Sequence, residues 1–205
     1  IAYYKNEESG NLSDEKFGEK VKIIGVGGGG SAIVEYLSNK YPNRYDSIIL
    51  NSDKKALTSR DVTNKIHLEK SDDFGCGSNT LCGYNLINDS VIDKLKSFIN
   101  TDKKVFIFAT LGGGCGSGSV RALSQYLPMK DLDIQYFLTT PFSWEGLKRT
   151  NRANETIEFL KNNNAKTTIF SNDNLLEFGN LTIKDCFHKQ DDEFHKLINS
   201  SLLLR

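Results

Sequence analysis

The chain has 205 residues and a formal net charge of +0 at pH 7; 38% of its residues are hydrophobic and 25% are charged. This length predicts one domain with a core large enough to fold alone. The balanced charge gives no electrostatic reason to expect nucleic acid as a partner. No apolar run approaches the roughly 20 residues of a membrane-spanning helix. Composition therefore indicates a globular domain without direct membrane insertion.

The first 20 residues are polar and contain neither the apolar core nor the cleavage site of a secretory signal. We therefore expect a polar N-terminal extension at residues 1–20, followed by a single folded domain at residues 21–205. The four cysteines form no CxxC pair and no metal-ligand spacing: Cys76, Cys82, Cys115 and Cys186. Reduced thiols in the cytoplasm are the plain interpretation of this pattern.

Strands and helices are expected to alternate along the chain. Short runs rich in valine, isoleucine and phenylalanine predict buried strands, at residues 21–26, 46–53, 65–69, 103–110, 133–140 and 165–172. Apolar residues at helical spacing predict helices between these runs, at residues 31–41, 84–98, 120–127 and 153–160, and from Thr182 to the end. Thr182 and Asp185 have the spacing of a capping box at the start of the last helix.

This alternation predicts an α/β fold, a three-layer, Rossmann-like parallel sheet with helices on both faces. In such sheets, ligands bind beyond the carboxyl ends of the strands. The polar and glycine-rich segments that follow the predicted strands are therefore the first candidates for a binding site.

Two predicted strands run directly into glycine clusters that open helices, in "IIGVGGGGSA" and "FIFATLGGGCGSGS". A helix start presents unpaired N–H groups and the positive end of a dipole, and glycine lets an anion approach the main chain closely. A third loop, "FGCGSN", also precedes a predicted helix. Three such loops at one edge predict a nucleotide phosphate tail held by main-chain amides, without a P-loop lysine.

The first loop alone allows two other interpretations. It is compatible with a tight strand-to-helix turn that binds nothing. Gly25, Gly27 and Gly30 also satisfy G-x-G-x-x-G, with Asp53 a little over twenty residues further on, which is a dinucleotide fingerprint and predicts NAD and an oxidoreductase. The second glycine cluster is the feature that the dinucleotide interpretation leaves unexplained.

Polar residues that interrupt apolar patterns suggest the rest of the ligand. Asp191 shares a helix side with Phe187 and Phe194, where a carboxylate must be paired, bind a ligand or reach water. It is suited to accept hydrogen bonds from N1–H and the 2-amino group of guanine. Glu145 and Arg149, spaced i and i+4, form either an ordinary surface pair or contacts to a sugar hydroxyl and a phosphate.

These motifs together resemble the nucleotide-binding domain of the FtsZ/tubulin superfamily, and FtsZ more closely than tubulin. "GGGCGSGS" resembles the GGGTGTG signature, "IIGVGGGG" the first phosphate loop, "ILNSDKKAL" the INTDxxAL segment and "FGCGSN" the xGAGxN loop. "PFSWEGLKR" is similar to PFxFEGxKR, and "SNDNLLE" to PNDxLL. The matches keep their order and approximate spacing from Val21 to about Asp192.

The resemblance implies that GTP or GDP binds with Mg²⁺. It places the phosphates against three loops, at Gly27, Gly28, Gly29, Gly75, Cys76, Gly77, Ser78, Gly113, Gly114, Cys115, Gly116 and Ser117. Asn51 and Asp53 are implied to lie near the phosphates and a hydrated Mg²⁺ that has no direct protein ligand.

For the nucleoside, the resemblance implies that Glu145 binds ribose, Arg149 lies beside the nucleotide, and Asn172 and Asp191 recognise guanine. Some positions depart from the family pattern. Cys115 replaces the usual threonine and so removes a hydroxyl donor. Other family residues are also replaced, by Ser31, Ala32, Thr110 and Leu111.

The resemblance further implies a cytoplasmic, filament-forming GTPase of cell division. In the family, the last helix leads to an acidic loop and a second domain, both expected to be absent here because the chain stops at "INSSLLLR". Catalytic groups are then expected in trans, from another copy or a full-length FtsZ-type subunit at the nucleotide face. The alternative is a non-catalytic interaction protein that caps or modulates filaments.

The cysteines allow one further hypothesis. The resemblance places Cys76 and Cys115 beside the phosphates, and a thiol near a helix start has a lowered pKa. A redox-sensitive nucleotide site is therefore one interpretation. Small neutral residues that only fill space are the other.

Overall fold

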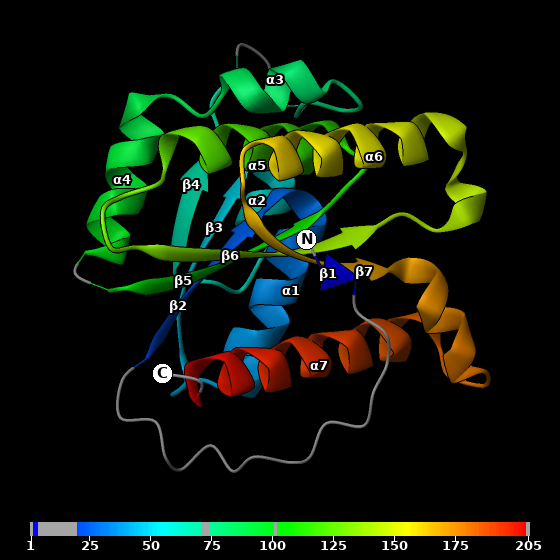
Figure 1. Ribbon diagram of the computed structural model, residues 1–205. Coiled ribbons are helices and arrows are strands. Elements are labelled where there is room, and N and C mark those ends of the chain that lie inside the picture. Colours follow the sequence, from blue (N-terminus) through cyan, green and yellow to red (C-terminus); the bar gives the residue numbers. More distant parts are fainter. Residues whose placement is uncertain (1, 4–19, 71–73, 101, 204–205) are drawn as a thin grey trace.

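A parallel β-sheet forms the centre of the computed structural model, which describes residues 2–3, 20–70, 74–100 and 102–203. Its strand order is β1-β7-β6-β5-β2-β3-β4, and every neighbouring pair is parallel (Figure 1). The strands are β1 (Ala2–Tyr3), β2 (Val21–Val26), β3 (Tyr45–Asn51), β4 (Asn64–His67), β5 (Lys104–Thr110), β6 (Asp133–Thr140) and β7 (Lys166–Ser171). The predicted parallel sheet is confirmed.

Helices cover both faces of this sheet, which confirms the predicted three layers (Figure 1). They are α1 (Gly27–Lys40), α2 (Lys54–Thr58), α3 (Thr80–Asn85), α4 (Asp89–Ile99), α5 (Gly114–Tyr126), α6 (Leu147–Asn162) and α7 (Ile183–Leu203). Helices α4, α5 and α6 cover one face, with α3 packed on α5, and α1, α2 and α7 cover the other. Among the described residues, no helix has both the length and the apolar character needed to cross a membrane.

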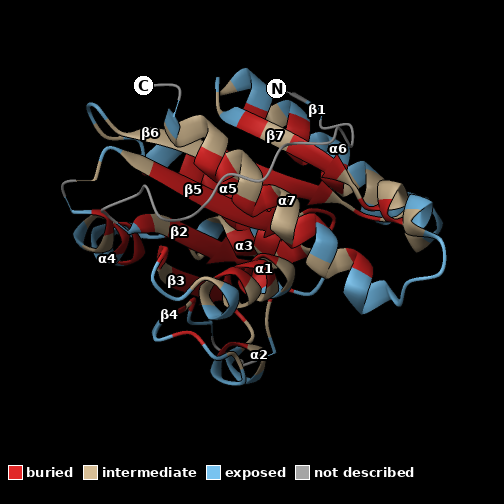
Figure 2. Cartoon of the chain, turned by 90° about the horizontal axis from the view of Figure 1, so that it is seen from below, coloured by how far each residue is buried: buried red, intermediate tan, exposed pale blue. Residues whose placement is uncertain are grey.

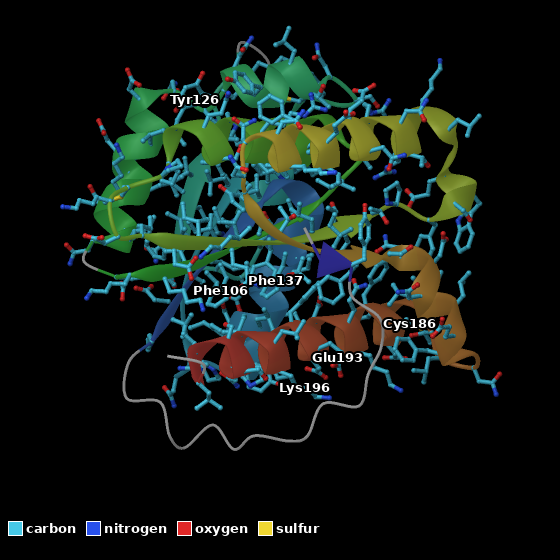
Figure 3. All side chains as sticks on the ribbon, in the orientation of Figure 1. Phe106, Tyr126, Phe137, Cys186, Glu193 and Lys196 are labelled. Carbon is cyan, nitrogen blue, oxygen red and sulfur yellow. A yellow bond between two sulfur atoms is a disulfide. The ribbon has the colours of Figure 1, made fainter. Side chains whose placement is uncertain are left out.

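The core consists of two apolar clusters, one on each side of the sheet. The strands in the middle of the sheet are buried along almost their whole length, as Figure 2 shows. On the α7 side the cluster is aromatic: Phe106 and Phe137 stack with ring centroids 5.7 Å apart and lie between the sheet and α7 (Figure 3). Phe194 of α7 packs edge-on against Phe108 and Phe170. This cluster fixes α7 against the strands.

The register of the strands brings their carboxyl ends to one edge. Val26 at the end of β2 pairs with Leu50 of β3 and with Ala109 of β5. On the other side of β5, Thr110 pairs with Thr139 of β6. The segments that leave β2, β3, β5, β6 and β7 therefore start next to one another, as expected for a parallel sheet.

The helices differ from the predicted ones mainly in where they begin. Helices α1 and α5 begin at Gly27 and Gly114, within the glycine clusters, and not after them. The single helix predicted at 84–98 is wrong: the chain forms α3 and α4, because the Asn88 side chain caps a new helix by accepting the N–H of Val91 at 3.1 Å. The short elements β1 and α2 were not predicted. Strand β1 falls in the predicted extension at 1–20, of which residues 1 and 4–19 lie outside the described part of the chain.

A buried polar cluster holds α7 in place along its C-terminal half. The hydroxyl of Tyr45 lies 2.6 Å from Nδ1 of His195, and Nε2 of the same ring lies 3.0 Å from Nδ2 of Asn199. Arg44 donates to Oδ1 of Asn199 from Nε and Nη2. At the start of α7, the hydroxyl of Thr182 accepts the N–H of Asp185, so the predicted capping contact is present.

Replacing Phe194 by alanine tests how far the fold depends on the aromatic cluster. We expect Phe194→Ala to lower the free energy of unfolding by about 3–5 kcal/mol, because it leaves a cavity among well-packed rings. Urea denaturation monitored by circular dichroism measures this loss. Leu176→Ala, at a side chain that is 57% exposed, is the control and should change stability by no more than about 0.5 kcal/mol. Equal losses of stability in Phe194→Ala and Leu176→Ala would contradict the assignment of Phe194 to a core cluster that stabilises the fold.

Candidate nucleotide-binding site

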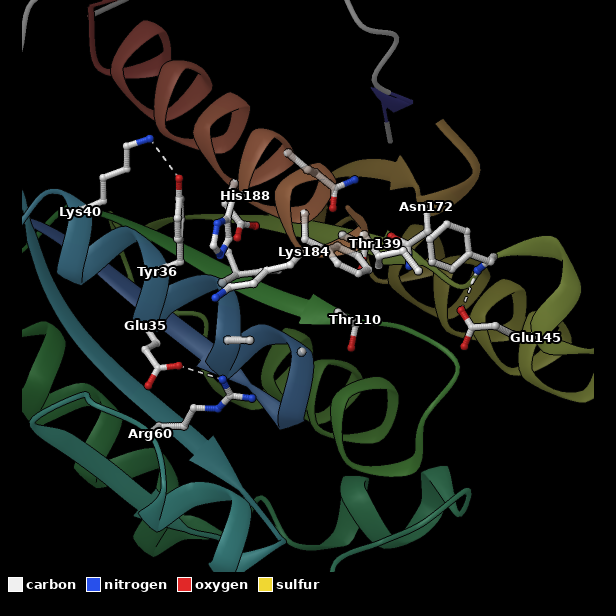
Figure 4. A pocket seen from close by; sticks show the side chains of 18 of the residues that line it. Glu35, Tyr36, Lys40, Arg60, Thr110, Thr139, Glu145, Asn172, Lys184 and His188 are labelled. Carbon is white, nitrogen blue, oxygen red and sulfur yellow. Dashed lines mark hydrogen bonds and ion pairs between the residues drawn. The ribbon is translucent and has the colours of Figure 1, made fainter. Parts of the chain in front are cut away.

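A cavity of about 1110 Å³ opens between α1 and α7, at the carboxyl ends of β5, β6 and β7 (Figure 4). Its volume is slightly above the usual range of small-molecule sites, which is about 300–1000 Å³. Predicted site residues from four separate segments line it: Gly29, Glu145, Arg149, Asn172 and Asp191. The fold therefore brings together residues that are up to 162 positions apart in the sequence.

The glycine loops meet one another at the end of this cavity. Gly27 has a φ of +72°, and a methyl group added to it would lie only 2.9 Å from the amide nitrogen of Gly116, so the first loop is packed directly on the second. The N–H of Gly114 donates to the carbonyl of Gly77 at 2.7 Å, which joins the second loop to the third. Among the described residues, no side chain caps the N-terminus of α1 or of α5. Open space lies beside Gly113, the residue before α5.

The third loop also contacts the end of β3. The N–H of Cys76 donates to the Ser52 hydroxyl at 3.1 Å. Asp53 caps α2 by accepting the N–H of Ala56 at 2.8 Å, and its own N–H donates to the Asn51 side chain at 3.1 Å. Asn51 and Asp53 thus help to shape the loop edge, and Asp53 remains partly exposed there.

The loops adjoin the cavity and are not, apart from Gly29, part of its lining. Two contacts connect them. Gly29 lies against the side chain of Thr110, and Arg149 packs on Gly112, where an added methyl group would lie 2.6 Å from the arginine Cγ. The predicted site residue Ser117 is buried, and its hydroxyl accepts the N–H of Gly112 at 2.9 Å. Ser117 therefore shapes the turn with its side chain.

Two adjacent aspartates at the other end of the cavity have opposite environments. Asp192 accepts hydrogen bonds from Lys40 at 2.6 Å and from Tyr36 at 3.1 Å. Asp191 is 5% exposed and lines the cavity, and within the described part of the chain it has no hydrogen bond or ion pair. Burial, with a smaller contribution from the neighbouring Asp192 charge, raises the pKa of the Asp191 carboxyl well above its usual value.

Other buried polar atoms of the cavity are also without partners. Oδ1 of Asn172 and Oγ1 of Thr139 have no hydrogen-bond partner among the described residues, although both are buried. Native proteins rarely leave such atoms unsatisfied, so ordered water or a ligand with matching groups is the expected partner. Thr139 was not predicted. Its position at the carboxyl end of a predicted strand is the signal that could have identified it.

The sequence analysis also missed aromatic residues that line the cavity. Tyr36 of α1 stacks on His188 of α7, with ring centroids 4.3 Å apart, and so closes the gap between the two helices (Figure 4). Phe187 packs edge-on against Phe142 at 6.2 Å, and both rings line the cavity. These flat apolar surfaces beside unpaired polar atoms suit a heteroaromatic ring.

Glu145 and Arg149 form the predicted i,i+4 ion pair at 2.8 Å, at the edge of the cavity (Figure 4). Oε1 of Glu145 also accepts the N–H of Phe142 at 2.8 Å. The pair is part of the local turn, and both of its side chains line the cavity together with Phe142.

The expectation of reduced thiols is wrong at two positions. Cys76 and Cys82 form a disulfide, with Cα atoms 5.6 Å apart. The two residues are separated by six positions, a spacing that matches no common motif, which is why sequence reasoning did not pair them. Cys115 is a free thiol and partly exposed, and Cys186 is free and buried. The disulfide closes a ring that contains Gly77 and Ser78 of the third loop.

Comparison with known proteins decides the family. A model described as the Tubulin/FtsZ family, GTPase domain, matches residues 20–180. The chain belongs to this family. The matched region includes the glycine loops, Glu145, Arg149 and Asn172, and ends before Asp191.

Individual relatives of this FtsZ/tubulin-family chain agree with the assignment. Cell division protein FtsZ of Aquifex aeolicus (strain VF5) is 32% identical over 183 residues, which cover 87% of this chain and 50% of the relative. The FtsZ of Mycoplasmopsis pulmonis (strain UAB CTIP) is 33% identical over 172 residues, 82% of this chain and 43% of the relative. A solved structure of M. jannaschii, an empty FtsZ dimer, has a TM-score of 0.74 at 26% identity, over 88% of this chain and 56% of that one. The chain spans about half the length of the curated relatives that it matches.

Reduction of the disulfide should destabilise this FtsZ/tubulin-family domain. A cross-link that closes so short a ring removes conformational entropy from the unfolded chain worth about 2 kcal/mol. We expect dithiothreitol to lower the free energy of unfolding by about this amount, measured by urea denaturation. A Cys76→Ser, Cys82→Ser double variant is the control and should not respond to the reductant. An unchanged denaturation midpoint of the wild type in reductant would contradict the prediction.

Proposed function

We propose that this chain binds GTP and GDP in the cavity between α1 and α7 and acts as an FtsZ-like domain of the cell-division cytoskeleton. The observation that carries the proposal is the buried carboxyl of Asp191, which has no hydrogen bond or ion pair with the described residues and lies at one end of a cavity whose other end adjoins the starts of α1 and α5. An acceptor suited to a guanine edge lines this cavity, and main-chain donors suited to phosphates adjoin it. The family match supports the guanine nucleotide.

The two ends of the cavity then have different tasks. Asp191 accepts hydrogen bonds from N1–H and the 2-amino group of guanine, and Asn172 supplies a further polar contact to the base. Glu145 accepts a hydrogen bond from a ribose hydroxyl. The main-chain amides at Gly28 and Gly113 bind the phosphates, where the helix dipoles stabilise negative charge.

Magnesium is the cation expected with a nucleoside triphosphate. Among the described residues, no cluster of three or more His, Cys, Asp or Glu side chains is placed to hold a metal ion. A hydrated Mg²⁺ held mainly by the phosphates fits this arrangement, because the partly exposed Asp53 carboxylate lies on the loop edge and can accept hydrogen bonds from its water ligands. Bound there, Mg²⁺ would neutralise phosphate charge.

Hydrolysis is proposed to require a second subunit on the nucleotide face, in the cytoplasm. Two large apolar side chains of the cavity lining are exposed, Trp144 at 60% and Ile183 at 67%, and Leu147, between the lining residues Glu145 and Arg149, is 80% exposed. Exposed apolar side chains gathered in one region are typical of association surfaces. The M. jannaschii relative is described as an FtsZ dimer, which supports self-association as the first choice of partner.

Turnover measured against protein concentration tests this part of the proposal. GTPase activity that rises more steeply than protein concentration indicates a site completed between chains. The alternative is a non-catalytic domain that binds guanine nucleotides and caps or modulates filaments. No turnover by the chain alone, with turnover restored by a full-length FtsZ-type protein, would favour that alternative.

Ligand-dependent thermal stability tests the nucleotide itself. The midpoint of thermal unfolding should rise with GTP and GDP, and rise further with Mg²⁺ for GTP, because a ligand that binds only the folded state stabilises it. ATP and NAD are the controls. A selective response to NAD would replace the proposal by the dinucleotide interpretation of Gly25, Gly27 and Gly30.

Replacing Asp191 should have opposite effects on GTP affinity and on the stability of the ligand-free protein. Asp191→Asn is expected to weaken GTP binding about tenfold or more, because hydrogen bonds to a charged acceptor are lost. The ligand-free variant should unfold at a higher temperature at neutral pH, because it no longer buries a carboxyl whose ionisation is opposed by its surroundings. Isothermal titration and thermal unfolding measure the two effects. Lys189→Ala, an exposed change two residues away, should alter neither.

The raised pKa of Asp191 also predicts a pH dependence. Between the usual carboxyl pKa and the raised one, the folded ligand-free protein binds more protons than the unfolded chain, so its stability falls as pH rises through this window. Guanine recognition needs the ionised carboxylate, so GTP affinity should fall as pH is lowered through the raised pKa. In Asp191→Asn, GTP affinity should vary with pH only because the phosphates of GTP ionise. If GTP affinity varies with pH in the same way in Asp191→Asn and in the wild type, Asp191 does not contact the base.

A further inference from the structure

Arg152, on the second turn of α6, contacts two of the three glycine loops. Its Nε donates to the carbonyl oxygen of Gly112 at 2.8 Å, and its Nη2 lies 3.3 Å from the hydroxyl of Ser78. One planar guanidinium therefore bridges the second loop to the third. The family motif "PFSWEGLKR" ends three residues before Arg152, so neither the motif nor helical periodicity singled this residue out.

The contact to Gly112 fixes the orientation of a main-chain amide. Gly112 has a φ of +94°, which turns its carbonyl to Arg152, while its own N–H is held by Ser117. Because a trans peptide is planar, the carbonyl of Gly112 and the N–H of Gly113 point in opposite directions. The N–H of Gly113 therefore points away from Arg152, at the uncapped start of α5 where open space lies beside it.

The charge of Arg152 is not neutralised locally. Within the described part of the chain, no carboxylate lies within ion-pair distance of its guanidinium, whereas Arg149, one turn earlier, is paired with Glu145 at 2.8 Å. The glycine loops themselves contain no lysine or arginine. Lys70, which precedes the third loop in the sequence, donates to the carbonyl of Gly75 from an exposed position. Arg152 is a cation that forms hydrogen bonds with both the second and the third loop.

We propose that Arg152 recognises the terminal phosphate and distinguishes a nucleoside triphosphate from a diphosphate. The inference rests on the proposed function, because it takes the ligand to be a guanine nucleotide whose terminal phosphate faces Ser78. The additional charge of a triphosphate is attracted to the unneutralised guanidinium beside Ser78. The fixed Gly112–Gly113 peptide supplies a donor at the same end. Arginine is suited to both tasks, because its planar fork holds two acceptors at once and leaves further donors for phosphate oxygens.

The experiment compares the affinities for GTP and GDP by isothermal titration with Mg²⁺ present. Arg152→Gln is expected to weaken GTP binding about tenfold and GDP binding by no more than about threefold. The ratio of GTP affinity to GDP affinity should therefore fall. Arg121→Gln is the matched control: Arg121 also joins α5 to α6, through the Thr156 hydroxyl at 3.1 Å, but it does not contact the loops. Arg121→Gln should leave the ratio of GTP affinity to GDP affinity unchanged, even if it lowers the stability of the protein.

The outcomes separate this inference from the proposed function. A wild type that binds neither GTP nor GDP overturns both. A wild type that binds them, with equal losses for GTP and GDP in Arg152→Gln, overturns only the role of Arg152. If Arg152→Gln does not fold, Arg152→Met decides, because methionine keeps an unbranched side chain but carries no charge and donates no hydrogen bond. The ratio of GTP affinity to GDP affinity should then be lower in Arg152→Met than in the wild type, and an unchanged ratio overturns the proposal.

Discussion

The site depends on one constraint, the parallel register of β2 and β5. Val26 and Ala109 are paired at the ends of these strands, so α1 and α5 begin beside each other at the same edge of the sheet. Their first turns are close enough that a methyl group on Gly27 would collide with Gly116. Two helix starts this close could direct main-chain N–H groups from both helices at one anion, as the proposed function requires. A side chain at Gly27 would collide with the second loop, so the glycine is needed for packing as well as for the proposed access of phosphate.

Helix α7 lines the opposite end of the cavity, and contacts away from the cavity set its position. The buried contacts of His195 and Asn199 with Tyr45 and Arg44 hold its C-terminal half against β3 and the segment that precedes it. This anchoring holds Asp191, one helical turn before His195, in the cavity, where it has no hydrogen bond or ion pair with any described residue. A buried carboxyl without such contacts costs stability. The proposed guanine nucleotide would compensate this cost, which is why the cavity end of α7 is the natural place for a base-recognising residue.

The sequence predicted the features that depend on local pattern. The six long strands follow from runs of valine, isoleucine and phenylalanine, and Asp191 was found because it interrupts an apolar helix face. The helix starts were placed too late because glycine has low helix propensity, although the strand ends force the chain to turn at Gly27 and Gly114. Thr139, Arg152 and the Cys76–Cys82 disulfide were missed because each depends on contacts between segments or on a spacing without a recognised motif.

The two parts of the third loop are held by different contacts. These contacts determine how the loop can respond to a ligand. Cys76 is held by the Ser52 hydroxyl and by the disulfide to α3, so this end of the loop is tied to β3 and α3. The exposed residues Gly77 and Ser78 contact instead the N–H of Gly114 and the guanidinium of Arg152. A phosphate that displaced Gly77 and Ser78 would therefore act on α5 and α6, because the contacts of these residues lead there, while the disulfide keeps the Cys76 end in place.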